Sequence, residues 1–199
     1  MAKTIQEGQI QELKELLGAH LCKSRLSSSL VGEVLKHQGK DLIRDWETVL
    51  RRRVKAISKM FARRVIVDPK MSPQQMLDAI GRKQNIVSSA VASMPRGKSG
   101  EIIVHFFPLT FFDSYLRVER LDEEYRIRGL KPHPIAQGQV NIDDPTFADR
   151  YSNNCYWEDT HGNLCFEKFY LWGGVERHAN VDLLNVWLGT QWFGGVYKS

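Results

Sequence analysis

The sequence predicts an α+β protein: a basic, helical N-terminal region followed by a module with a small antiparallel sheet rich in aromatic residues. Two observations carry this prediction. Apolar residues recur at helical spacing through the first part of the chain, and strand-like apolar and aromatic runs dominate beyond residue 100. The 199 residues, 42% hydrophobic and 26% charged, are typical of a folded globular protein. We place the boundary between residues 1–71 and residues 72–199.

Three helices are predicted in the first region. Residues 5–17 and 29–38 have short amphipathic patterns, and Gly39 is expected to end the second of these helices. A longer helix then runs from about Lys40 to Arg64. Its apolar residues, at about 100° per residue, fall on one narrow stripe. The stripe consists of Ile43, Trp46, Leu50, Val54, Ile57 and Phe61.

The opposite side of this third helix is basic. The stretch Leu50–Arg64 contains seven Lys or Arg residues in fifteen positions and no acid. Spaced cations of this kind are what phosphate contacts need, and they have few acidic partners within the helix. The candidate nucleic-acid-binding residues are Arg44, Arg51, Arg52, Lys55, Lys59 and Arg63.

The second region begins with a well-signalled helix. Ser72 suits the N-cap, Pro73 the first helical position, and Gln75 completes a capping box. The turn-forming stretch 94–100 is predicted to be a hinge, and "EIIVHFFPL" a buried strand. "RLDEEYRIRGL" is predicted to be a helix ended by a glycine, and residues 131–145, with three prolines, a loop.

The tail of the chain is aromatic. "CYWEDTHGNLCFEKFYLW" predicts a C-terminal β-hairpin turning near His161 and Gly162, and "WLGTQWFGGVYKS" predicts another strand. Trp and Tyr at this density are most simply explained by packing, because their rings bury large areas.

Several segments of the second region resemble a known group of sequences. These segments are "EEYRIRGLKP", "NIDDPTFAD", "YWEDTHGNLCFEKFYLWGG" and "WFGGVYKS". They resemble short, uncharacterised bacterial proteins with a Trp-x-Asp-x-x-Gly-x-x-Cys-Phe pattern and a Trp-rich C-terminal strand. The pattern falls on Trp157, Asp159, Gly162, Cys165 and Phe166. The resemblance carries no known activity, and it implies only that residues from about 72 onward form one recurring module.

Metal binding and catalysis are not predicted. Cys155, His161 and Cys165 give three ligands where a structural zinc site needs four, and a two-residue turn would place the cysteines on opposite faces. A three-residue loop would place them on the same face. Three cysteines, an odd and sparse set, favour free thiols and a reduced, cytoplasmic location. No cofactor is expected.

Acid–base candidates are present, but they lie in no recognisable catalytic motif. They are His105, His161, His178, Glu119, Asp122 and Glu123. Catalysis would require groups that converge from distant positions.

The charge distribution decides the functional hypothesis. Residues 1–100 hold 19 Lys or Arg against 9 Asp or Glu, and residues 101–199 hold 9 against 14. A basic front half favours a polyanionic partner, so the leading hypothesis is a non-catalytic protein that contacts nucleic acid mostly non-specifically. The alternatives are a protein-interaction module using the amphipathic helices or the aromatic tail, docking of the basic helix on an acidic segment such as "LDEE", and an uncharacterised enzyme. No apolar run is long enough to span a membrane, and the oligomeric state is not predicted.

Overall fold

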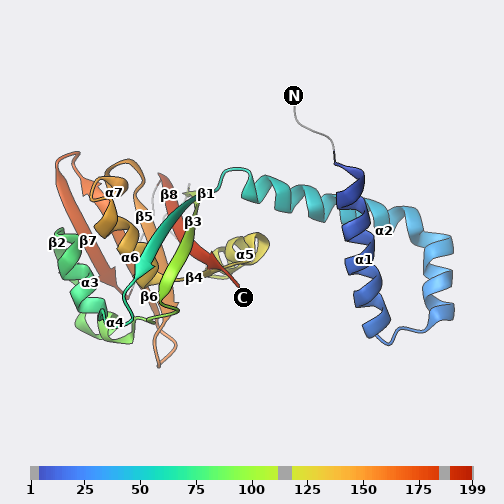
Figure 1. Ribbon diagram of the computed structural model, residues 1–199, viewed down its shortest axis with the longest axis horizontal. Coiled ribbons are helices and arrows are strands. Elements are labelled where there is room, and N and C mark those ends of the chain that lie inside the picture. The colour runs from blue at the N-terminus through green and yellow to red at the C-terminus, as the bar shows by residue number, and fades with distance from the viewer. Residues whose placement is uncertain (1–4, 112–117, 184–188, 199) are drawn as a thin grey trace. The chain divides into compact units, whose positions relative to one another are not determined.

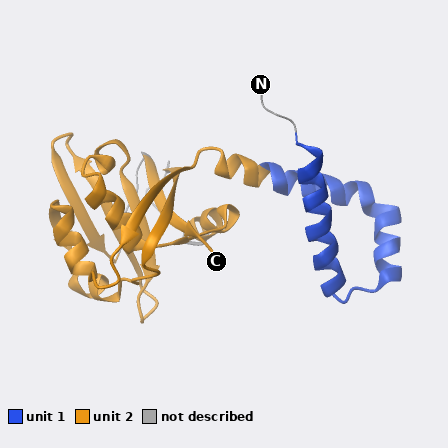
Figure 2. Cartoon of the chain, in the orientation of Figure 1, with its two compact units in different colours: residues 1–51 blue, residues 52–199 orange. Residues whose placement is uncertain are grey.

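A computed structural model describes residues 5–111, 118–183 and 189–198. The chain divides into two compact units, residues 1–51 and residues 52–199 (Figure 2). The sequence placed the boundary after residue 71, but the division falls earlier. The reason is that residues 61–67 form a strand of the sheet in the second unit.

The first unit consists of two helices, α1 (Glu7–Lys23) and most of α2 (Ser28–Ile57) (Figure 1). The prediction of two separate helices, one ending at Gly39 and one beginning at Lys40, is wrong, because α2 runs through both positions. A glycine ends a helix when it takes a left-handed φ, as Gly81 does at the end of α3 with φ 66°. Gly39 has no positive φ and lies within the helix.

The far end of the predicted third helix is also corrected. Helix α2 stops at Ile57, and strand β1 (Phe61–Val67) begins at Phe61. The Phe61 ring lies 5.5 Å from that of Phe106 and 4.9 Å from that of Trp192. Packing of this aromatic side chain against the sheet therefore overrides the helical periodicity of the sequence.

The second unit is built on one eight-stranded sheet. Its central path follows the order β1-β3-β8-β5-β6-β7-β2, and β4 pairs with β8. The other strands are β2 (Lys83–Ile86), β3 (Gly100–Phe111), β4 (Leu130–Pro132), β5 (Asn153–Glu158), β6 (Leu164–Trp172), β7 (Glu176–Asp182) and β8 (Gly189–Tyr197). The α+β class is confirmed, but the prediction of an antiparallel sheet is wrong. The sheet is mixed, because β2 pairs with β7 and β5 pairs with β8 in parallel.

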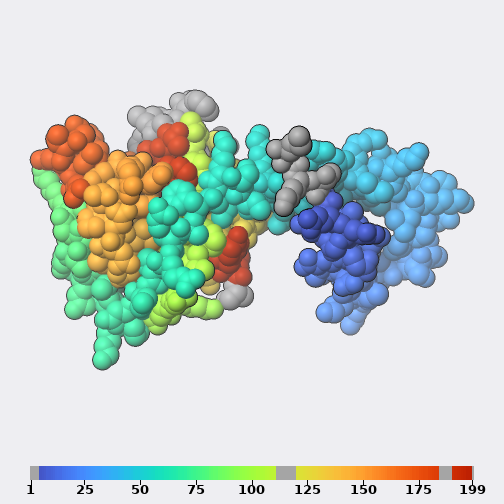
Figure 3. Space-filling view, turned by 45° about the horizontal axis from the view of Figure 1, so that its top comes forward, coloured from blue at the N-terminus to red at the C-terminus, as the bar shows by residue number. Residues whose placement is uncertain are grey.

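Helices cover both faces of this sheet. On one face lie α3 (Pro73–Ile80), α4 (Ser88–Ser93), α6 (Pro134–Asp143) and α7 (Phe147–Arg150); residues of all four join the larger hydrophobic core. On the other face α5 (Val118–Arg128) contributes Leu121 and Tyr125 to a second core. Strand β3 serves both cores, since Phe106 points into the first and Phe107 into the second. Helix α6 packs against β1, as the orange and teal surfaces in Figure 3 illustrate.

Residues 131–145, predicted to be a loop, contain β4 and helix α6. His133 caps α6: its Nδ1 accepts a hydrogen bond from the Ala136 backbone N–H at 3.1 Å, and Pro134 occupies the first turn. Gly138 lets α6 approach α3 closely, since a Cβ there would lie 2.0 Å from the Met76 sulfur. The predicted hinge at residues 94–100 is a connection within the second unit, and Met94 is buried.

The predicted hairpin is present as β5 and β6, but with a longer loop than the two-residue turn. Glu158 pairs with Leu164, so residues 159–163 form the connection. The Asp159 carboxylate accepts hydrogen bonds from the backbone N–H groups of His161 and Asn163, both at 2.8 Å. A short polar side chain that satisfies the loop backbone in this way explains the extra residues.

The other predicted elements of the second region are found. Ser72 caps α3 through its hydroxyl, which accepts from the Gln75 N–H at 3.2 Å. The two predicted strands correspond to β3 and β8, and the predicted helix before Gly129 corresponds to α5. Within the part of the chain that the structure describes, no helix combines the length and apolar character needed to cross a bilayer.

Candidate protein-interaction surface

The helices of the N-terminal region expose their apolar side chains. No residue of α1 or α2 is buried. Ile43 is 71% exposed, Leu30 67% and Trp46 42%. Helix propensity alone leaves isolated helices of this kind marginal in water, and most helical stability in proteins comes from packing of the apolar face. A contiguous exposed apolar surface is therefore typical of a binding site.

A groove of about 900 Å³ runs along these helices. Helix α1 contributes Leu17 and Leu21, and α2 contributes Leu35, Leu42, Trp46 and Leu50. We call this surface the apolar groove. All of its residues lie between Leu17 and Leu50, within the first unit.

Four of the six candidate nucleic-acid-binding residues already have partners. Arg44 lies 3.3 Å from Asp41, and Arg51 lies 2.5 Å from Glu47. Arg63 is not on the helix but on β1, where its guanidinium lies over the Phe61 ring at 5.1 Å.

The fourth partnered residue, Arg52, reaches α5. Its guanidinium lies 3.2 Å from the Glu123 carboxylate, which also pairs with Arg126. These cations hold the pKa of Glu123 below its ordinary value, the Arg126 hydrogen bond being the largest cause. This one ion pair joins the basic end of α2 to the acidic segment "LDEE", and docking on that segment stays one of the alternatives that the sequence left open.

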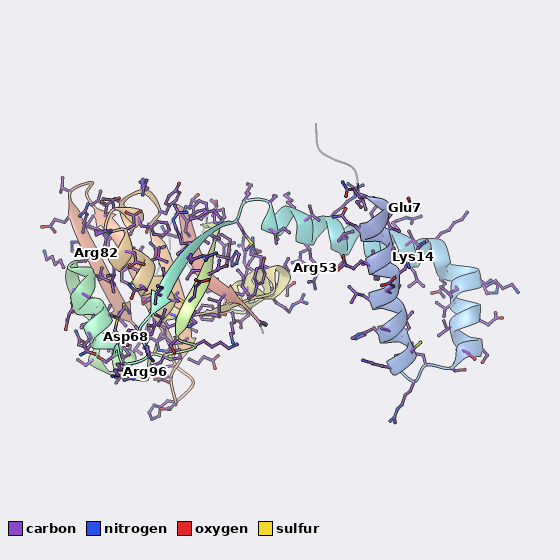
Figure 4. The ribbon with its side chains drawn as sticks, viewed as in Figure 1. Glu7, Lys14, Arg53, Asp68, Arg82 and Arg96 are labelled. Atoms are coloured by element: carbon purple, nitrogen blue, oxygen red, sulfur yellow. The ribbon has the colours of Figure 1, made fainter. Side chains whose placement is uncertain are left out.

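The remaining two candidates, Lys55 and Lys59, are exposed and make no ion pair with any described residue. Arg53, which the sequence did not single out, projects from the same end of α2 (Figure 4). The structure therefore leaves a small cationic cluster, residues 53–59, in place of the predicted row of six.

The residues considered for metal binding do not converge. Cys155 and Cys165 share a face of the β5–β6 pair, because Cys155 pairs with Glu167 and Trp157 pairs with Cys165. Both thiols are buried and free, and burial raises the pKa of each. His161 lies in the exposed loop. Among the described residues, no three His, Cys, Asp or Glu side chains form a metal-binding group.

The acid–base candidates are scattered. His178 lies 3.1 Å from Glu176 and its ring stacks on Tyr170, while Asp122 accepts a short hydrogen bond from Tyr156. His105 is half-buried on β3, and burial lowers its pKa. The side chain of Glu119 lies outside the described residues. The three acids share helix α5, whereas the three histidines lie on β3, on β7 and in the β5–β6 loop. Among the described residues, no contact joins these groups into an acid–base pair with a nucleophile.

One buried carboxyl group was not predicted from the sequence. Glu167 is fully buried on β6, and neither of its oxygens has a hydrogen-bond partner among the described residues. Burial raises its pKa well above the ordinary value, because the charged form is disfavoured away from water. Gln137 on α6 is likewise fully buried with its amide unpaired among these residues. An acid in the "CFEKF" run gives no sign of burial: strand alternation places Glu167 on the same face as Cys165, but it does not tell whether that face is buried.

Comparison with models of known protein families, with characterised proteins and with solved structures finds no match. Function must therefore be inferred from the geometry of this chain, and its resemblance to a group of uncharacterised bacterial proteins stays a prediction.

Proposed function

We propose that the protein is a non-catalytic binding protein that associates with a helix of a protein partner through the apolar groove of α1 and α2. The observation that carries this proposal is that neither helix buries a single residue. Ordering 47 residues in two helices costs conformational entropy that only burial of apolar area offsets. A partner that covers the groove supplies this burial.

The occupant that best suits the groove is a second copy of this chain. A compact monomer of 22.9 kDa exposes about 9,600 Å² by the scaling of folded proteins, whereas this chain exposes 13177 Å². The excess, roughly 3,600 Å² per chain, is more than enough for an obligate homodimer, which buries roughly 2,000–5,000 Å² summed over both subunits. Because neither helix buries any of its residues, these helices are a major source of that excess.

Charge favours an antiparallel arrangement of two α2 helices. Residues 48–57 hold four Lys or Arg and no acid, whereas residues 28–47 hold four acids and three Lys or Arg. A parallel pair would bring the two basic ends together, and like charges at close range are destabilising. An antiparallel pair places each basic end beside the half of its partner that contains the acids.

Oligomeric state tests the proposal directly. Analytical ultracentrifugation of the full chain should show a dimer at micromolar concentration. Leu42→Glu places a charge in the groove and should give a monomer that retains the signals of a folded second unit. Thr48→Glu adds the same charge on the opposite side of α2 and should remain dimeric. A wild-type chain that is monomeric with the groove exposed, or a Leu42→Glu chain that still dimerises, would contradict the proposal.

Binding of nucleic acid by residues 53–59 is the second candidate function. The observation in its favour is that Lys55 and Lys59 are exposed and unpaired among the described residues, so their charge is open to a phosphate. A cytoplasmic location fits both candidates, since Cys155 and Cys165 lie buried as free thiols.

A further inference from the structure

The sheet of the second unit opens between β3 and β8. Strand β8 pairs with β3 from Gly189 to Gly195, and its last residues pair with β4 on the other side. The backbone N–H of Lys198 continues this course by donating to the Gly129 carbonyl at 3.0 Å. Residues 101–104 of β3 therefore have a strand neighbour only on the side of β1. A hollow of about 610 Å³ lies at this opening, within the size range of small-molecule sites.

One rim of the hollow is a preorganised loop. His133 Nδ1 accepts from the Ala136 N–H, so Nε2 carries the proton and donates to the Lys98 carbonyl at 2.9 Å. Burial lowers the pKa of His133 and favours this neutral form. Gly97 has φ 67°, and a Cβ there would lie 2.4 Å from His133 Nε2. The histidine and the glycine together fix the backbone that carries Lys98 into the lining.

The lining is positively charged. Lys98 and Lys131 are its two cations, and Glu101 is its only acid among the described lining residues. The Glu101 carboxylate lies 3.1 Å from the Arg64 guanidinium, which offsets its charge. Two cations in a concave site raise the local concentration of anions.

The remaining walls are flat and apolar. The His105 and Tyr197 rings lie 4.5 Å apart between centroids. Tyr197 is 54% exposed, so one of its faces is available for stacking. Pro132 and Val196 complete the apolar side of the hollow.

We propose that this hollow binds a small molecule that joins a planar ring to an anionic group, either a carboxylate or a phosphate. The ring stacks against Tyr197, and the anion lies between Lys98 and Lys131. The site is independent of the apolar groove, because all of its residues belong to the second unit.

Two pairs of probes test this site by isothermal titration calorimetry on the full chain. Adenosine monophosphate and indole-3-acetate carry a ring and an anion, whereas adenosine and indole-3-acetamide are their uncharged counterparts. Inorganic phosphate supplies the anion alone. At least one charged probe should bind about tenfold more tightly than its uncharged counterpart and than phosphate. Whichever charged probe binds shows which combination of ring and anion the hollow accepts.

Variants locate the binding. Lys131→Gln should weaken the charged probe about tenfold and leave its uncharged counterpart unchanged. Lys70→Gln removes an exposed cation outside the hollow and should change neither. Glu101→Gln should strengthen binding of the charged probe, because the lining then loses its acid. The proposal is overturned if no probe binds, if phosphate binds as tightly as the charged probes, or if Lys131→Gln binds them like the wild type.

Discussion

The two units of this chain differ in what stabilises them. Helices α1 and α2 bury no residue. The second unit instead buries a cluster of aromatic and aliphatic side chains on each face of its sheet, with Phe106 and Phe107 fully inaccessible. Local hydrogen bonds and helix propensity account for the first unit, and tertiary packing accounts for the second. The second unit thus has hydrophobic cores of its own, whereas helices α1 and α2 bury no residue.

The largest difference between the two units is expected when one aromatic side chain in each is truncated to alanine. Phe106→Ala removes a ring that packs against Phe61 and Phe147, and it should lower the free energy of unfolding by about 3–5 kcal/mol. Trp46→Ala, at a side chain that is 42% exposed, should instead weaken dimerisation, so its effect should depend on protein concentration. Urea unfolding at two protein concentrations measures both. Equal, concentration-independent losses would contradict the comparison.

The next comparison is between two acids, the buried Glu167 and the exposed Glu47, each replaced by glutamine. Burial raises the pKa of Glu167 above the ordinary 4.5, so the folded chain holds a proton that the unfolded chain releases. This stabilisation is complete below pH 4.5 and is lost as pH rises toward the folded pKa. Glu167→Gln carries no proton to lose, so it should be more stable than the wild type at neutral pH, by about 1.4 kcal/mol for each pH unit above 4.5 until the folded pKa is reached. Unfolding free energies at pH 5, 7 and 9 test this. Glu47→Gln, at an exposed ion pair, should change the free energy of unfolding by less than about 1 kcal/mol.

Two glycines should respond with opposite signs. Gly97→Ala forces a side chain into a left-handed φ and against His133, so it should destabilise the second unit by about 1–2 kcal/mol or more. Gly18→Ala meets no atom within 4 Å in α1 and should stabilise that helix by up to about 1 kcal/mol. Thermal unfolding followed by circular dichroism distinguishes the two. A stable Gly97→Ala chain would mean that the loop adjusts freely.

The smallest effect on stability is expected from the exposed lysines of α2. Lys55→Gln with Lys59→Gln should leave unfolding nearly unchanged. If residues 53–59 contact phosphates, the log–log salt dependence of binding to duplex DNA should fall by about 0.9 for each lysine removed. Lys14→Gln on α1 is the control (Figure 4). An unchanged slope would remove nucleic acid from the candidate functions.

Local signals predicted local structure well. The Ser72 cap and the apolar stripe of α2 follow from spacing alone, and both are found. Long-range pairing was not predictable: Phe61 joins β1 because of Phe106 and Trp192, which are distant in sequence. Of the candidate site, the sequence supplied the stripe and the cations. The ion pairs of these cations and the exposure of the stripe are seen only in the structure, because both depend on how the elements are arranged.

The position of β8 has a consequence for synthesis. It is the last strand in chain order, yet it lies between β3 and β5 in the sheet (Figure 1). During synthesis, β3 and β5 cannot pair with β8 until residues 189–197 have left the ribosome. Pairings between segments so distant in sequence form slowly. Helices α1 and α2 need only local contacts and emerge first. Nascent chains on one messenger could therefore join through their helices while their sheets are still incomplete.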